Sequence, residues 1–323
     1  MSQTSVAAPK ATTVAQRMAA HLAILRLDHS VKQVFVLPGI VIAANIGRAP
    51  IDASFAARIV LGIAAATAVA SSNYVLNELL DAPFDRLHPT KCNRPAASGI
   101  VHYPAAYLQW IVLALTGFLL AYAVSKALLI SVLALWIMGC VYNIRPLRTK
   151  DIPYLDVLSE SINNPLRFCI GWYAVTSDVL PPVSLLIAYW MLGCYFMALK
   201  RFSEYRQIGC DAAAGYRRSF VFYTEKSLLN SVSFYAATAM LFFGAFIMRY
   251  RIELVLAFPV IAILMAVYFD LAFEEDSAVQ NPEKLLWEPR LMILVSVCMV
   301  TLIVLSSVDL PWMQQLFAKS VHR

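Results

Sequence analysis

Long apolar runs constrain this chain more than any other feature. Overall, 60% of its residues are hydrophobic and only 14% are charged, whereas a soluble domain is about 25% charged. About nine runs are close to the ~20 residues that a helix needs to cross the hydrocarbon core of a bilayer. The sequence therefore predicts an all-α, polytopic membrane protein. Its expected spans are 33–49, 57–80, 104–124, 127–143, 154–175, 183–202, 228–248, 253–273 and 290–308.

The segments outside these runs leave no room for a second folded unit, because no loop is long enough to bury a core of its own. Residues 1–13 are small and polar, and we expect a disordered tail there. The N-terminus lacks the pattern of a signal peptide, so the first apolar run is expected to be a retained span. We therefore expect a single transmembrane domain over residues 14–323.

Lysine and arginine are distributed unevenly between the two sides of the predicted bundle. Most lie in the N-terminal segment and in the loops that follow the second, fourth, sixth and eighth spans. Cytoplasmic loops carry the excess of basic residues in membrane proteins. The sequence therefore predicts a multi-pass protein of the inner (plasma) membrane, with its N-terminus and all of its polar motifs on the cytoplasmic side.

The first polar motif closes the second span. Asn77, Asp81 and Asp85 are spaced four apart, which places them on one face of a helix. Carboxylate and amide oxygens suit Mg²⁺, which commonly takes few protein ligands together with substrate phosphate. Basic residues that suit phosphate follow at once, at Arg86, Lys91 and Arg94. The pattern predicts a magnesium-diphosphate site, and the simpler alternative is a solvated helix end.

A second motif ends the sixth span, where Lys200 and Glu204 stand four apart beside Arg201. Ionisable groups at such a position are a functional hypothesis by default, and the simpler alternative is a basic belt in the headgroups. Arg218 continues the same loop and suits either phosphate or anionic lipid. Arg167 lies inside the fifth span, where a buried arginine needs an anion, either a substrate phosphate or a carboxylate.

Together these features resemble the UbiA-type intramembrane prenyltransferase superfamily. The resemblance rests on the motif from Asn77 to Asp85 at a span end, the nine helices and the second polar motif. In most of that superfamily the second motif is rich in aspartate. Here it is Lys200-Arg201-x-x-Glu204, which is similar to the polyprenyl-phosphate (decaprenyl-phosphate) phosphoribosyltransferase branch.

Further matches to that branch occur in the right order along the chain. They are Asp-Arg-x-His-Pro-Thr-Lys-x-x-Arg-Pro from Asp85 to Pro95, the pair Arg218-Ser219, Asp156 with Arg167 in the fifth helix, and the basic residues Arg26 and Lys32. Two departures stand out. Asn77-Glu78 replaces the usual Asn-Asp, and the segment from His29 to Gln33 replaces Gln-Trp-x-Lys-Asn.

The resemblance implies Mg²⁺-dependent transfer of 5-phosphoribose from phosphoribosyl diphosphate (PRPP) to a polyprenyl phosphate, for a D-arabinose donor lipid. It implies catalytic roles for Asp81, Asp85, Lys91 and Glu204, and metal binding by Asn77, Asp81 and Asp85. Substrate-binding roles are implied for Arg26, Lys32, Asn77, Arg86, Lys91, Arg94, Arg167, Lys200, Arg201 and Arg218. The expected partners are the two substrates and the lipid bilayer, with a possible homo-oligomer and no nucleic acid.

Two other functions stay open at this point. One is a prenyltransferase that moves a prenyl chain from a prenyl diphosphate to an aromatic acceptor. The other is a non-enzymatic lipid-binding or transport protein. Transporters tend to show repeats and broken helices near the membrane midplane, whereas the polar residues here gather at one interface.

Overall fold

A computed structural model describes residues 13–47, 52–86, 91–209, 218–280 and 282–317. The tail expected over residues 1–13 lies outside this range, except for Thr13. That residue begins helix α1 (Val14–Ala23) with a capping box, in which its hydroxyl accepts from the Gln16 backbone and the Gln16 side chain accepts from the Thr13 backbone. Such reciprocal bonds satisfy backbone donors that a helix start leaves unpaired.

Every secondary-structure element of the described residues is a helix. Those of the first half are η1 (Leu27–Val36), α2 (Leu37–Gly47), α3 (Ala53–Asp85), α4 (Tyr103–Val124), α5 (Lys126–Asn143), α6 (Leu155–Ser161) and α7 (Asn163–Val175). Those of the second half are α8 (Val183–Ile208), α10 (Glu225–Tyr250), η5 (Ile252–Ala257), α11 (Phe258–Leu271), α12 (Pro282–Leu285), α13 (Pro289–Ser307) and α14 (Pro311–Leu316). Short 3-10 turns complete the list: η2 (Lys91–Asn93), η3 (Thr149–Asp151), η4 (Arg218–Val221) and η6 (Ala278–Gln280).

Eight helical segments are long and apolar enough to cross a membrane, counted over the described residues. The first is counted from Val14 to Asn45 and includes α1, η1 and α2, with the left-handed residue Arg26 between α1 and η1. This confirms the all-α, multi-pass prediction and is close to the expected number of about nine.

The missing span is the one expected at 154–175, which is broken at Ile162 between α6 and α7. Pro165 explains the break, because its ring has no N–H and clashes with the carbonyl four residues earlier. Both pieces remain in the interior of the bundle, and Phe168 and Trp172 of α7 are fully buried.

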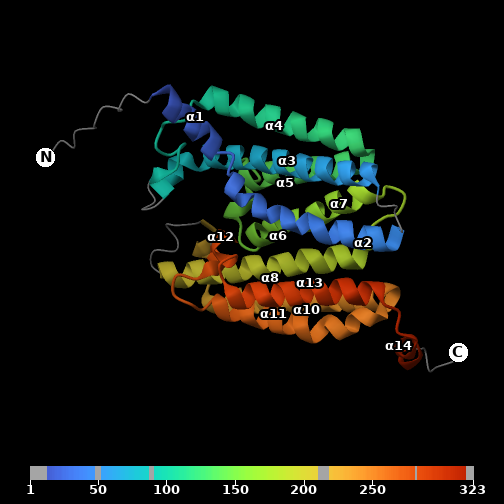
Figure 1. The fold of residues 1–323 in the computed structure, drawn as a ribbon. Coiled ribbons are helices and arrows are strands. Elements are labelled where there is room, and N and C mark those ends of the chain that lie inside the picture. The colour runs from blue at the N-terminus through green and yellow to red at the C-terminus, as the bar shows by residue number, and fades with distance from the viewer. Residues whose placement is uncertain (1–12, 48–51, 87–90, 210–217, 281, 318–323) are drawn as a thin grey trace.

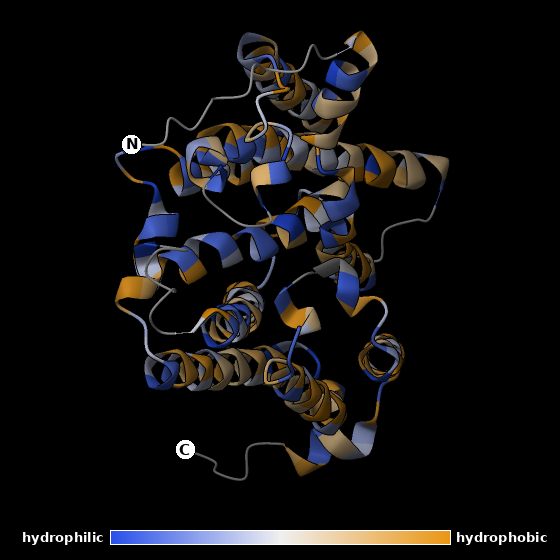
Figure 2. Ribbon diagram, turned by 90° about the vertical axis from the view of Figure 1, so that its left-hand side faces the viewer, coloured by the Kyte–Doolittle hydropathy of each residue, from blue (hydrophilic) through white to orange (hydrophobic). Residues whose placement is uncertain are grey.

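The long helices lie roughly side by side, with α3, α4 and α5 in one group and α8, α10, α11 and α13 in another (Figure 1). Helices α2 and α7 lie between the two groups. The N-terminal helix α1, the C-terminal end of α3 and α12 share one end of the bundle, and α14 lies at the other (Figure 1). Figure 2 looks onto the first of these ends, where hydrophilic residues gather on loops and helix termini. The described parts of both polar motifs lie at this end.

A close backbone crossing joins α2 to α7. A Cβ atom added at Gly39 would lie 2.1 Å from the carbonyl oxygen of Phe168, and one added at Gly171 would lie 2.1 Å from that of Val36. Small residues allow helix backbones to approach in this way inside a membrane. Each glycine therefore leaves the space that the backbone of the other helix fills.

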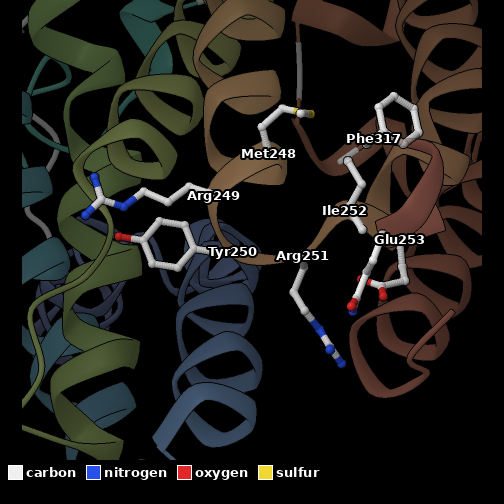
Figure 3. Close-up of a pocket in the computed structure, with 8 residues that line it drawn as sticks. Met248, Arg249, Tyr250, Arg251, Ile252, Glu253 and Phe317 are labelled. Carbon is white, nitrogen blue, oxygen red and sulfur yellow. The ribbon is translucent and has the colours of Figure 1, made fainter. Parts of the chain in front are cut away.

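A separate cavity of about 260 Å³ lies at the far end of the bundle, between the α10–η5 corner and α14. In Figure 3, Arg249 and Tyr250 point to one side of it, and Glu253 and Phe317 lie on the other. Glu253 accepts a hydrogen bond of 3.2 Å from the backbone of Leu310, and Arg251 pairs with Asp309. These contacts dock the C-terminal helix, far from the polar motifs.

We predict that Gly171→Ala lowers the thermal unfolding midpoint, because the new methyl group meets backbone atoms that cannot rotate away. Overpacking of this kind costs ~1–3 kcal/mol. The matched control is Gly244→Ala in α10, where an added Cβ meets no atom within 4 Å. That change should be neutral or stabilising by up to ~1 kcal/mol. Thermal melts in detergent measure both, and equal midpoints for the two variants would contradict the crossing.

Candidate functional site

The carboxylate of Asp81 is held by two cations from the linker between α5 and α6. Its Oδ1 atom lies 2.5 Å from Nζ of Lys150 and 2.9 Å from Nη2 of Arg148. Both cations are buried, with exposed fractions of 5% for Lys150 and 8% for Arg148. Nε of Arg148 also donates to Asp151 at 2.9 Å, which orients the guanidinium. The first motif therefore contains an ion cluster, not a solvated carboxylate.

Asn77 joins the same cluster through an amide of α5. Its Nδ2 donates to Oδ1 of Asn143 at 2.6 Å, and that oxygen also accepts from Lys150 at 2.9 Å. Asn143 is fixed in turn by its own bond to the carbonyl of Gly139. Asn77 and Asp81 are thus linked through shared partners, one turn apart on α3.

Asp85 and Glu78 are held from the other side by the segment after α3. Oδ2 of Asp85 lies 2.7 Å from Nη1 of Arg94. Buried Glu78 accepts from the backbone of Ala96 at 3.3 Å and lies 4.0 Å from Nε of Arg26. Arg94 therefore reaches Asp85 of the first motif, and Arg26 reaches its neighbour Glu78.

The other two basic residues of this stretch are placed differently. Nε of Arg86 donates to the carbonyl of Ala97 at 3.1 Å, so this side chain braces the loop. Lys91 begins η2 directly after 87–90, the part of the predicted motif that lies outside the described residues.

The donor set at the end of α3 fits Mg²⁺ in type, although it has no ready-made cage. No group of three or more histidine, cysteine, aspartate or glutamate side chains that could hold a metal occurs among the described residues. Mg²⁺ usually uses one or two carboxylates and completes its shell with water and phosphate. Asp81 and Asp85 supply that number. Their present partners, Lys150, Arg148 and Arg94, are the residue types that pair equally well with phosphate oxygens.

The second motif is organised around buried Arg201. Its Nε lies 3.2 Å from Oδ2 of Asp156 on α6, and its Nη1 lies 2.8 Å from Oε2 of Glu204 on its own helix. Asp156 also accepts from Ser219 at 3.3 Å and from Tyr223 at 2.7 Å. Burial beside the Asp156 carboxylate raises the pKa of Tyr223, so the phenol stays protonated and donates. Glu204 is thus paired with Arg201, three residues away.

Lys32 and Lys200 face a third acid, Glu160 at the end of α6. Nζ of Lys32 lies 3.8 Å from Oε1 of Glu160 and 5.9 Å from the centre of the Tyr74 ring. Lys200 and Arg201 also act on Glu160 electrostatically. These contacts bring the N-terminal segment, α6 and α8 together at one polar cluster.

Arg167 on α7 differs from the other buried cations. It is only 6% exposed, its Nε atom is buried without a hydrogen-bond partner, and it forms no ion pair with any described residue. Arg218 also has no ion pair within the described part of the chain, but it is exposed, and its neighbour Ser219 reaches Asp156 instead. A buried charge without a partner is costly, so Arg167 marks a place for an anion.

Sequence reasoning missed the residues that complete the first motif. Asn143, Arg148 and Lys150 belong to a linker that reads as a basic interfacial segment. One signal was available, because this linker starts from a span end on the same side as the first motif. Its length and basic residues allow it to reach Asp81.

Comparisons with known proteins identify the family and the fold. A family model described as the UbiA prenyltransferase family matches residues 34–310. Among solved structures, a UbiA homologue from Archaeoglobus fulgidus bound to GPP and Mg²⁺ superposes with a TM-score of 0.67 at 21% identity, covering 90% of this chain and 100% of that one. At this identity the likeness concerns the fold.

Two curated relatives are more similar in sequence. Decaprenyl-phosphate phosphoribosyltransferase from Mycolicibacterium smegmatis is 30% identical over 211 residues, which are 65% of this chain and 64% of the relative. The protein of the same name from Corynebacterium glutamicum is 31% identical over 225 residues, which are 67% of this chain and 63% of the relative. The chain thus spans a little under two thirds of the length of these relatives.

We predict that Asp156→Ala strongly destabilises the protein, because Arg201, Ser219 and Tyr223 all lose their bond to this carboxylate at once. Removing one member of a buried ion pair costs ~3–5 kcal/mol. Asp178→Ala, at an exposed loop position, is the matched control and should change stability by less than ~0.5 kcal/mol. Thermal melts in detergent measure both. A melt of Asp156→Ala that overlays that of the control would show that the network does not hold the bundle together.

Proposed function

Because the chain belongs to the UbiA prenyltransferase family, we propose that it is a transferase that moves 5-phosphoribose from PRPP to a polyprenyl phosphate. The products are polyprenylphosphoryl-5-phosphoribose and diphosphate, for a D-arabinose donor lipid. Residues 14–323 form the single catalytic domain in this proposal. Similarity to two relatives named decaprenyl-phosphate phosphoribosyltransferase supports the choice of substrates.

The observation that carries the proposal is buried Arg167, which has no counter-ion among the described residues. Arginine at a membrane site is retained where it meets an anion, and its planar fork suits a phosphate group. Asp156, which lies on α6 just before the break between α6 and α7, already forms an ion pair with Arg201. A substrate phosphate is therefore the partner that fits Arg167.

The composition of the second motif favours a sugar donor over a prenyl donor. The second motif itself supplies one acid, Glu204, beside the bases Lys200 and Arg201, so it offers a second metal ion fewer carboxylates than the aspartate-rich motif of most of the superfamily. Lys32 adds a further cation to this cluster. Side chains of this kind hold the phosphate of PRPP or of the acceptor lipid directly, without a second metal ion.

The donor diphosphate fits the first motif. Asp81 and Asp85, with Asn77, would hold Mg²⁺, and the ion would supply charge neutralisation for the leaving diphosphate worth several kcal/mol of the barrier. Arg148, Lys150 and Arg94 already lie at these carboxylates, and Lys91 follows in the same segment. Cations placed where charge develops stabilise the transition state without reorganising.

The chemistry then needs little help from a general base. The bond between C1 of the ribose and the diphosphate oxygen breaks, and an oxygen of the polyprenyl phosphate forms a new bond to C1 from the opposite face. The acceptor is already an anion, so its attacking oxygen carries no proton to remove. Inversion at C1 is expected. Glu204 and Lys200 are proposed to orient the ribose and one phosphate.

We infer that this end of the bundle faces the cytoplasm, since most lysine and arginine residues belong to loops on that side. PRPP is water-soluble and would enter from there. The lipid acceptor would enter from within the membrane.

The first test of this function is an assay with radiolabelled PRPP, Mg²⁺ and polyprenyl phosphate. Membranes with the wild-type protein should form a labelled lipid that is cleaved by mild acid, and Asp81→Ala should abolish it. Label that enters an aromatic acceptor from a prenyl diphosphate, with none from PRPP, would support the prenyltransferase instead. Absence of both activities with retained lipid binding would favour a non-enzymatic role.

Arg167→Met separates a substrate role from a structural one. Replacing an unpaired buried charge by an apolar residue should leave the melting temperature unchanged or higher. The KM for PRPP or for polyprenyl phosphate should rise tenfold or more, since a bond to a charged group is lost. Arg201→Met is the control and should melt early, because Asp156 and Glu204 both lose their ion pair with Arg201. Equal destabilisation of both variants would assign Arg167 to the scaffold.

A further inference from the structure

A second cavity opens beside the first motif, on the outer side of α3. It has a volume of about 600 Å³ and lies between α3, α4 and the start of the linker after α5. Sites for small ligands commonly measure about 300–1,000 Å³. The cavity lies at the same end of the bundle as Asp81, but α3 presents a different face to it.

The walls of this cavity are largely apolar, and several of them are exposed at the surface of the protein. They are formed by Leu76, Leu80, Pro83, Phe84, Tyr107 and Trp110. Phe84 is 54% exposed and Tyr107 is 38% exposed. In a protein that spans a membrane, exposed side chains of this kind at a span end meet lipid chains or the headgroup boundary. The walls therefore suit a hydrocarbon chain.

The polar end of the cavity carries two arginines that differ in burial and in ion pairing. Arg148 is buried, stacks at 5.1 Å over the ring of Phe84 and binds Asp81. Arg145 is exposed and forms no ion pair with any residue in the described ranges. An arginine at the end of an apolar groove presents a free guanidinium to an anion whose tail lies in the groove, as in lipid headgroup binding.

We propose that this cavity binds the acceptor lipid, with its phosphate at Arg145 and the first part of its isoprenoid chain between α3 and α4. The inference rests on the proposed function and adds the location of the acceptor. Arg148 is shared between the cavity and Asp81, so a phosphate bound here lies one side chain away from the donor carboxylates. That continuity favours the reacting lipid over a bulk phospholipid.

The test uses the purified full-length protein with PRPP, Mg²⁺ and polyprenyl phosphate, and two variants. Arg145→Gln removes the proposed phosphate contact, and Leu80→Trp fills the apolar part. Arg145→Gln should raise the KM for polyprenyl phosphate about tenfold, as expected for loss of one charge-assisted contact. Leu80→Trp should also raise it, because the larger side chain takes the space of the hydrocarbon chain. Both should leave the KM for PRPP unchanged. Arg249→Gln, at the cavity near α14, is the matched control and should change neither constant. An unchanged KM for the acceptor in both variants, with wild-type transfer intact, overturns the location and leaves the proposed function standing.

A binding experiment separates failure of the location from failure of the function. Polyprenyl phosphate with a photoreactive group on its first isoprene unit should label peptides containing residues 76–84 or 107–110, whether or not PRPP is consumed. Labelling should fall in Arg145→Gln. Labelling confined to other helices overturns the inference. Equal displacement of the probe by phosphatidylglycerol also overturns it, because the cavity would then be a general site for anionic lipids.

Discussion

The ion network of Arg201 is the interaction on which the polar end of the bundle depends. Arg201 on α8 forms an ion pair with Asp156 on α6. Asp156 also accepts hydrogen bonds from Ser219 of η4 and from Tyr223, which precedes α10. Taking each of these charges out of water costs several kcal/mol, which is recovered only when the geometry of the pair is good. The network therefore tolerates a single arrangement. It fixes how the broken segment of α6 and α7 meets the second half of the protein, and with it the positions of Lys200 and Glu204.

Arg167 and Arg201 show how two arginines with similar burial serve different purposes. Their exposed fractions are 6% and 2%, so solvent compensates neither charge. Arg201 finds its anions within the protein, whereas Arg167 finds none among the described residues. Burial of Arg167 without an anion among the described residues lowers the stability of the protein. Functional sites commonly retain a local cost of this kind.

The sequence predicted the spans because length and hydrophobicity decide what a bilayer accepts. The one altered span, 154–175, contains Pro165, whose effect on a helix could have been foreseen. The alignment of Asn77, Asp81 and Asp85 on one helix face could also be predicted, because they belong to one helix and helical spacing is fixed. The partners of Asp81 could not be predicted from the sequence. Arg148 and Lys150 are 67 and 69 residues away and reach Asp81 only through tertiary packing of the linker. The roles of the site residues stay predictions.

The two cations on Asp81 have a consequence for the order in which ligands arrive. Nζ of Lys150 lies 2.5 Å and Nη2 of Arg148 lies 2.9 Å from Oδ1 of Asp81. Both cations repel a bare divalent ion that approaches this carboxylate. The same ion already neutralised by diphosphate meets attraction instead, because the two cations can turn from the carboxylate to the phosphate oxygens. Electrostatics thus favour entry of the metal ion and the donor as one complex over entry of the metal ion alone.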